Sequence, residues 1–357
     1  MRLHPEEMEL AQAYWRSLEF EPLAPEQIKR LGEQGKDLRE WFRTHQALHN
    51  LINAAVFLFL FLADYWVLLK MPRWLLAPGQ AHSNGRLALA GFLAGSLHSI
   101  LFYSLGVYSM HEGAAHKSIF AGRGRIASVA NFLASNICRL AACDPNHYAK
   151  HHMSHHSRFG TAADGEFLNF VRPRRLWLTL LPLGALTNFN DFLAHRAEKY
   201  TRSRIVSALL TIAFHGTYAV LTYRAFGGLF TLVAFGICFP HVGFYLDRLR
   251  QFTEHNLMPL DNTNGSRSLG CGFWGLLIGG GPWGSPCHWE HHLVSGIPWY
   301  QQLIVHFKLT RMLTPQQREQ FLIEPVIGFP KLWWRLVRDL YEFERRCEPA
   351  QTRASAR

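Results

Sequence analysis

The chain has 357 residues, of which 48% are hydrophobic, 13% aromatic and only 18% charged. Soluble domains usually carry about 25% charged residues, so this composition argues against two ordinary soluble domains. The formal charge of +11 could suggest nucleic acid. Lys and Arg do not alternate with aromatic residues as a strand-binding groove requires, so we expect no nucleic-acid partner.

The N-terminal residues 1–47 are polar and charged. Leu38, Trp41 and Phe42 are spaced as on one face of a helix, with charged residues between them. We therefore expect a cytosolic helical segment before the first apolar run.

Two apolar runs follow. Residues 51–69 contain a single charge, Asp64, and residues 87–110 contain none. A helix needs about 20 apolar residues to cross a bilayer, so both runs qualify. The linker 71–86 is rich in Pro, Gly and Asn and predicts a turn, which makes the two runs a hairpin.

A second pair of apolar runs lies further along the chain, at residues 205–223 and 226–246. Only Arg224 and Ala225 separate these runs, which indicates a tight turn. The sequence thus predicts an all-α membrane protein with four transmembrane helices in two hairpins.

One aspartate and three histidines fall inside these spans: Asp64, His98, His215 and His241. A polar group is costly in hydrocarbon, so each should face the bundle interior or lie near a helix end. For His98 and His215 we expect a hydrogen bond between helices.

Shorter apolar stretches at 126–142, 176–186 and 270–281 fit interfacial or buried segments better than spans. The Arg-rich tail predicts a solvated or membrane-surface helix. We expect three parts: a cytosolic N-terminal segment, a membrane domain and a cytosolic C-terminal tail, over residues 1–47, 48–310 and 311–357.

Ten of the 20 histidines fall in three short stretches, 111–116, 147–156 and 288–292. With four spans, all three stretches lie on one side of the membrane. A redox metal site needs a soluble reductant, so we place that side, with a helical cap, in the cytoplasm.

The second and third stretches contain histidines at positions i, i+3 and i+4, which share one helix face. Three imidazoles on one face each have a donor and an acceptor to satisfy, and a metal resolves that problem. These residues are His152, His155, His156, His288, His291 and His292.

The first stretch, His111-Glu-Gly-Ala-Ala-His116, has a different spacing. Residues i and i+5 lie about 140° apart on an ideal helix. His111 and His116 can share one site only if the helix ends or bends, which Gly113 permits. Alternatively, Glu112 and His116 face together, with Glu112 as a carboxylate ligand.

Imidazole ligands suit iron, zinc and copper, and a structural zinc needs only four. At least eight candidates suggest two metals. A histidine-rich dinuclear site without soft ligands, beside a bilayer, points to iron and oxygen chemistry.

The pattern HX4H, HXXHH and HXXHH, with membrane hairpins between, resembles the integral-membrane fatty acid desaturase and hydroxylase superfamily over about residues 50–310. The resemblance implies a di-iron centre, O2 as co-substrate and an apolar tunnel for a lipid-like substrate. It also implies a further histidine after the fourth span, at His255. His241 is the rival, but it lies deeper in the span.

His147 and His151 depart from the family pattern, because they create an overlapping box with His152. We prefer His152, His155 and His156 as ligands, because their spacing matches that of the third histidine stretch. We expect His147 and His151 to lie outside the ligand set. Carboxylates should hold the ligand rings, and the candidates are Glu112, Asp164, Glu254 and Glu290.

The six cysteines form no CxxC pair, which argues against a zinc ribbon, and the haem and iron–sulfur motifs are also missing. A separate electron donor, a ferredoxin or cytochrome, must therefore dock.

Four tryptophans lie in or near the third histidine stretch: Trp274, Trp283, Trp289 and Trp299. Tryptophan rings favour the depth of the membrane–water interface, so we expect these residues there.

The favoured function is O2-dependent desaturation of a fatty acyl chain. The alternative is a hydroxylase or ketolase acting on a lipid, carotenoid or alkane with the same di-iron site. A third reading, a non-catalytic metal- or lipid-binding membrane protein, fits poorly with an intact set of nine histidines.

Overall fold

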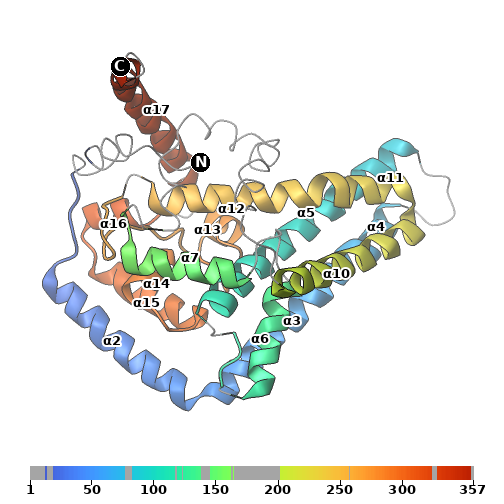
Figure 1. Ribbon diagram of the computed structural model, residues 1–357, viewed down its shortest axis with the longest axis horizontal. Coiled ribbons are helices and arrows are strands. Elements are labelled where there is room, and N and C mark those ends of the chain that lie inside the picture. Colours follow the sequence, from blue (N-terminus) through green and yellow to red (C-terminus); the bar gives the residue numbers. More distant parts are fainter. Residues whose placement is uncertain are drawn as a thin grey trace. The chain divides into compact units, whose positions relative to one another are not determined.

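The computed structural model describes residue 13 and the ranges 19–76, 83–116, 119–122, 124–137, 145–161, 164, 202–256, 258–323 and 328–354. Within these ranges every regular element is a helix (Figure 1), and β pairing is limited to a bridge between Ser268 and Leu322. The expected all-α architecture is confirmed for this part of the chain.

The chain divides into two compact units. The first unit comprises Met1–Arg43, Lys150–Leu181 and Arg248–Arg357, and the second comprises Thr44–Ala149 and Pro182–Asp247. The predicted domain boundaries at 47/48 and 310/311 stay a prediction.

The second unit is built from long helices interrupted by π-helical turns, labelled η. Its elements are α3 (Gln46–Tyr65), η1 (Trp66–Lys70), α4 (Met71–Leu75), α5 (Asn84–Tyr108), η2 (Ser109–Ala115), α6 (Arg125–Ile137), α10 (Arg202–Phe226), α11 (Gly228–Thr231), η5 (Leu232–Cys238) and the first part of α12 (Phe239–His255).

The first unit contains the end of α12 and further helices. They are α2 (Pro25–Thr44), most of α7 (Pro145–Arg158), α13 (Phe273–Ile278), α14 (His288–Leu293), α15 (Trp299–Met312), α16 (Pro315–Phe321) and α17 (Gly328–Ala354). The helices expected before the first span and in the tail are therefore present as α2 and α17.

Three helical stretches among the described residues are long and apolar enough to cross a membrane: Gln46–Leu75, Asn84–Ala115 and Gly228–His255. The first two contain the first and second predicted spans, and the third contains residues 228–246 of the fourth, as expected of an integral membrane protein. The third predicted span lies within the continuous helix α10, which is not one of the three. The four-span topology stays a prediction.

The first hairpin departs from its predicted boundary. A turn was expected from Met71, but the helix continues to Leu75 as α4. Pro72 is tolerated because it lies in the first turn of α4. Backbone N–H groups in the first turn of a helix have no intrahelical acceptor, so a proline there costs no hydrogen bond. The next helix, α5, is capped by the Ser83 hydroxyl, which accepts from the N–H of Arg86.

The second hairpin turns at Gly227 instead of at Arg224 and Ala225, which belong to α10. Gly227 has φ +86°, a left-handed conformation that glycine adopts without the steric cost of a Cβ atom. One residue therefore suffices to reverse the chain between α10 and α11.

Asp64 and His98 meet inside the second unit. His98 Nδ1 lies 2.6 Å from Asp64 Oδ1, and both side chains are fully buried. Pairing satisfies two polar groups that would otherwise be costly in hydrocarbon. The expected interhelical contact of His98 is confirmed, whereas His241 is only half-buried.

Close packing of α5 on η5 depends on small residues. A Cβ atom on Gly95 would lie 2.5 Å from the Cα atom of Ala234, and its other near neighbours are also backbone atoms. Small residues allow helix backbones to approach in this way in membrane proteins.

We expect Gly95→Ala to destabilise the second unit by about 1–3 kcal/mol, because backbone atoms cannot move aside as a flexible side chain can. Gly216→Ala in α10 is the control, since a Cβ atom there meets nothing within 4 Å. Thermal unfolding of the detergent-solubilised variants measures the difference. Equal midpoints for the two variants would contradict the packing argument.

The core of the first unit surrounds Trp289. Its ring stacks on Phe321 with centroids 4.1 Å apart, its indole N–H donates to the Thr263 carbonyl, and its backbone N–H donates to the Ser268 hydroxyl. Trp289 is 0% exposed. Trp289 is therefore buried within the protein, where it anchors α14, and its expected interfacial depth stays a prediction.

Candidate metal centre

Two helices present histidines at the predicted spacing. In α7, His152, His155 and His156 follow one another at i, i+3 and i+4, and α14 repeats this arrangement. Helix α14 is only six residues long, so it owes its stability to packing around Trp289 rather than to length.

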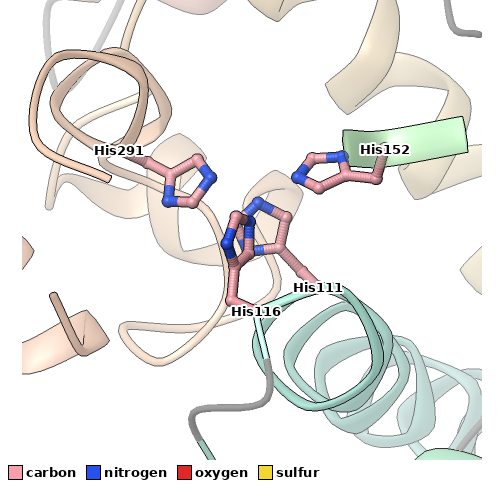
Figure 2. Close-up of side chains that lie close together, drawn as sticks. All are labelled: His111, His116, His152 and His291. Carbon is pink, nitrogen blue, oxygen red and sulfur yellow. The ribbon is translucent and has the colours of Figure 1, made fainter. Parts of the chain in front are cut away.

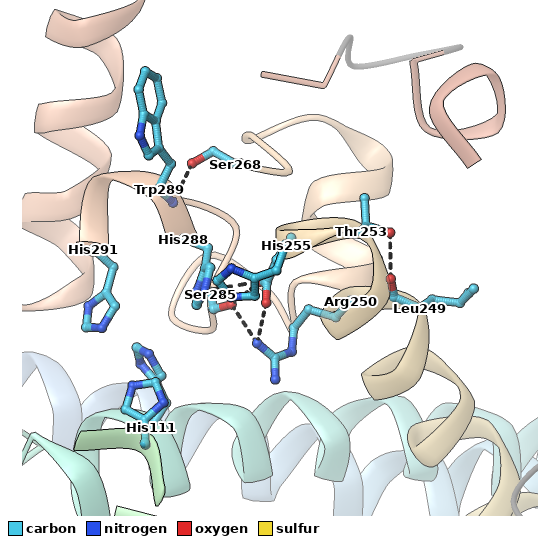
Figure 3. A network of polar contacts seen from close by, with 12 residues as sticks. His111, Leu249, Arg250, Thr253, His255, Ser268, Ser285, His288, Trp289 and His291 are labelled. Atoms are coloured by element: carbon cyan, nitrogen blue, oxygen red, sulfur yellow. Dashed lines mark hydrogen bonds and ion pairs between the residues drawn. The ribbon is translucent and has the colours of Figure 1, made fainter. Parts of the chain in front are cut away.

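Four of the predicted ligands form one group in the first unit. The nitrogens of His155, His255, His288 and His292 all lie within 4.8 Å of one another. His288 Nε2 lies 2.8 Å from His255 Nε2 and 3.1 Å from His292 Nε2. Figure 3 shows His255, from the end of α12, facing His288 at the start of α14.

The outer nitrogens of this group have carbonyl or carboxylate partners. His155 Nδ1 donates to Asp164 Oδ1 at 2.9 Å, and His255 Nδ1 donates to the Gly265 carbonyl at 3.2 Å. With the proton on Nδ1, the Nε2 lone pair of each ring points into the group. Converging imidazole lone pairs match the coordination that iron accepts, so the donor set fits a metal ion.

Burial also keeps the His292 ring in the form that binds metal. The pKa of His292 lies well below its usual range, because burial disfavours the charged ring and neighbouring imidazoles add repulsion. A neutral imidazole is the metal-binding form.

A further set of imidazoles lies beside this group in the first unit. His156 Nε2 is 3.0 Å from His152 Nε2 and 2.9 Å from His291 Nε2. His152 and His291 stack with centroids 6.0 Å apart. The structure thus brings all seven predicted ligands of the first unit into one region.

His111 and His116 form a pair in the second unit, at the end of the helix that begins with α5 (Figure 2). Their ring centroids are 5.1 Å apart. The backbone N–H of His116 donates to the carbonyl of His111, five residues earlier, which is the bonding pattern of the π-helical turn η2. The other two residues drawn in Figure 2, His152 and His291, belong to the first unit.

A π-helical turn therefore replaces the predicted bend. Gly113 has a different role from the one expected: a Cβ atom there would lie 2.5 Å from Ile119 Cδ1 and 2.9 Å from Ser135 Oγ. Its small size allows the 119–122 segment and α6 to pack against η2. The pKa of His116 is lowered to about 4 by burial, so this ring is neutral at pH 7.

All four candidate carboxylates are buried, which excludes plain surface acids. Glu112 Oε1 lies 3.0 Å from His111 Nδ1, and Asp164 holds His155. Glu254 Oε1 lies 3.8 Å from His288 Nδ1. Glu290 differs, because it contacts His306 at 2.6 Å and the Ser268 hydroxyl, and neither belongs to the predicted ligand set.

Sequence reasoning missed the groups that hold Glu254. Arg250 Nη1 donates to Glu254 Oε2 at 2.7 Å and the Ser285 hydroxyl donates to Glu254 Oε1 at 2.6 Å. The i, i+4 spacing of Arg250 and Glu254 on α12 was a signal that could have found the pair. Ser285 lies 31 residues from Glu254 along the chain, and no sequence pattern links the two residues.

His151 and His241 fall outside the group of four. His151 is half-buried on α7, and the side chain of His147 lies outside the described residues. On α12, His255 joins the group of four, whereas His241 lies fourteen residues earlier and belongs to the second unit.

We expect Asp164→Asn to lower activity about 10–100-fold, the usual cost of losing an outer carboxylate partner of a metal ligand. The amide keeps the shape of Asp164 but removes the charge that fixes the His155 proton on Nδ1. Asp339→Asn, in an exposed ion pair on α17, is the control. Steady-state turnover of purified protein measures the effect, and equal rates for both variants would contradict it.

The family model "Fatty acid desaturase" matches residues 87–322, which cover more than half of the chain and include all nine predicted histidines. No curated protein matches the chain significantly.

Proposed function

We propose that this chain, which belongs to the fatty acid desaturase family, is a membrane di-iron oxidoreductase that uses O2 and external electrons to desaturate a fatty acyl chain. The observation that carries the proposal is the buried group of His155, His255, His288 and His292, whose nitrogens converge within 4.8 Å.

The proposal assigns all nine histidines to two irons. Four of them form the group around His288, and the other five are proposed as the remaining ligands. These five are His152, His156, His291, His111 and His116. Each supplies a neutral imidazole, which suits ferrous iron.

When bound, two ferrous irons would supply the reduction of O2 to an oxidant strong enough to attack an unactivated C–H bond. The residues of the chain place and orient the ligands. Asp164 holds the proton of His155 on Nδ1, and Gly265 does the same for His255. The Arg250 guanidinium and the Ser285 hydroxyl hold Glu254 near His288, so that its charge is balanced.

Electrons are proposed to come from a separate ferredoxin or cytochrome that docks on the cytoplasmic side. The chain carries 37 Lys and Arg against 26 Asp and Glu, and a basic surface attracts an acidic donor. The substrate is proposed to be a fatty acyl group whose hydrocarbon tail enters the apolar helices from the membrane.

Product analysis tests the proposal. The chain is expressed with a matched electron donor, and total fatty acids, carotenoids and alkanes are profiled by mass spectrometry. Acyl chains that lose two hydrogen atoms are expected. If acyl chains stay unchanged while any lipid gains oxygen, the desaturase assignment fails and the hydroxylase or ketolase alternative replaces it.

A further inference from the structure

A cluster of sulfur, nitrogen and oxygen ligands lies behind the third histidine stretch, and the proposed iron chemistry does not use it. The ligand atoms of Cys287, Glu290 and His306 lie within 4.8 Å of one another, and all three side chains are buried. A second thiol, Cys271, hydrogen-bonds with Cys287. We propose that these four residues form a separate zinc site in the first unit.

The geometry of α14 separates this cluster from the proposed iron ligands. Successive residues of a helix turn by about 100°, so Glu290 points about 200° away from His288. Cys287 lies one residue before the helix, and His306 comes from α15. The short helix therefore presents histidines on one face and the thiol–carboxylate cluster on the other.

The chemistry of the donor set selects the metal. Two thiolates and an imidazole are ligands that zinc favours, and a carboxylate completes a tetrahedral set. Four protein ligands leave no open position, which is typical of a structural site rather than a catalytic one.

The charges of the cluster also favour a cation. Glu290 is fully buried and lies 2.6 Å from His306 Nδ1. The Cys287 sulfur is also buried and lies within 4.8 Å of the ligand atoms of both residues. A buried carboxylate beside buried thiols favours a bound cation, and a divalent ion supplies that charge.

Such a site would connect three segments that belong to different elements of the chain. Cys271 precedes α13, Cys287 and Glu290 belong to the α14 region, and His306 lies in the middle of α15. A metal here would hold the loop between α13 and α14 against α15. This inference does not rest on the proposed function, because it concerns neither iron nor turnover.

The test measures zinc in full-length protein purified in detergent after growth with added iron and zinc. We expect about one zinc per chain in the unchanged protein. Cys271→Ser and Cys287→Ser should lose that zinc. Cys238→Ser, which removes a buried free thiol of the second unit, should retain it. Unchanged zinc in both Cys271→Ser and Cys287→Ser, or no zinc in the unchanged protein, would overturn the inference.

Cobalt substitution keeps the test decisive if the cysteine variants do not fold. Co²⁺ bound by thiolates gives a near-ultraviolet charge-transfer band that histidine ligands alone do not give. We expect this band in the unchanged protein and its loss in His306→Gln or on chelation. Cobalt uptake without a thiolate band would show that no such site exists.

Discussion

His155→Ala is expected to lower turnover by more than about 100-fold, beyond the cost of losing an outer partner of a metal ligand. His155 is 0% exposed, its Nδ1 donates to Asp164, and its ring lies 4.8 Å from that of His255 and 5.1 Å from that of His292. Alanine removes a ligand and leaves Asp164 buried without its partner ring. Turnover and iron content of the purified variant measure the loss.

His151→Ala is the matched control on the same helix. His151 is half-buried and lies outside the groups of converging nitrogens, so we expect activity within about twofold of the unchanged protein. The pair of variants distinguishes the two overlapping histidine boxes of α7. Full activity in His155→Ala, or loss in His151→Ala, would show that the ligands belong to the other box.

His255→Ala is expected to release one of two irons and to reduce activity below detection. His255 Nε2 lies 2.8 Å from His288 Nε2, and no other described residue of α12 contributes to the group of four. His241→Ala, on the same helix, should keep both irons, because His241 lies in the second unit.

Iron analysis with Mössbauer or electron paramagnetic resonance spectroscopy distinguishes these outcomes. A mononuclear spectrum in His255→Ala and an unchanged dinuclear spectrum in His241→Ala are expected. The reverse result would assign the ninth ligand to His241. About one zinc and no iron in the unchanged protein would contradict the di-iron proposal itself.

Local spacing explains why the second and third histidine stretches could be predicted. Within one helix, residues at i, i+3 and i+4 share a face whatever the rest of the protein does, so His152, His155 and His156 need only a helix to converge. Apolar runs predict spans for the same reason, because length and composition are local properties.

The proximity of His111 and His116 could be established only from the structure. Their i, i+5 spacing is wrong for an α-helix, and they are brought together by a π-helical turn, against which Ile119 and Ser135 pack so closely at Gly113 that a Cβ atom would not fit. The turn at Gly227 is similar, since its left-handed conformation is one of several that a glycine allows.

By itself, the sequence determined the all-helical class, three of the four predicted spans, the resemblance to a desaturase family and the histidines of α7 and α14, because each of these follows from composition or from spacing within one element. Only the tertiary structure decided that Trp289 is buried, that Arg250 and Ser285 hold Glu254, and that Cys271 reaches Cys287. These contacts join residues from different elements, and packing between elements, rather than periodicity within one, sets which side chains meet.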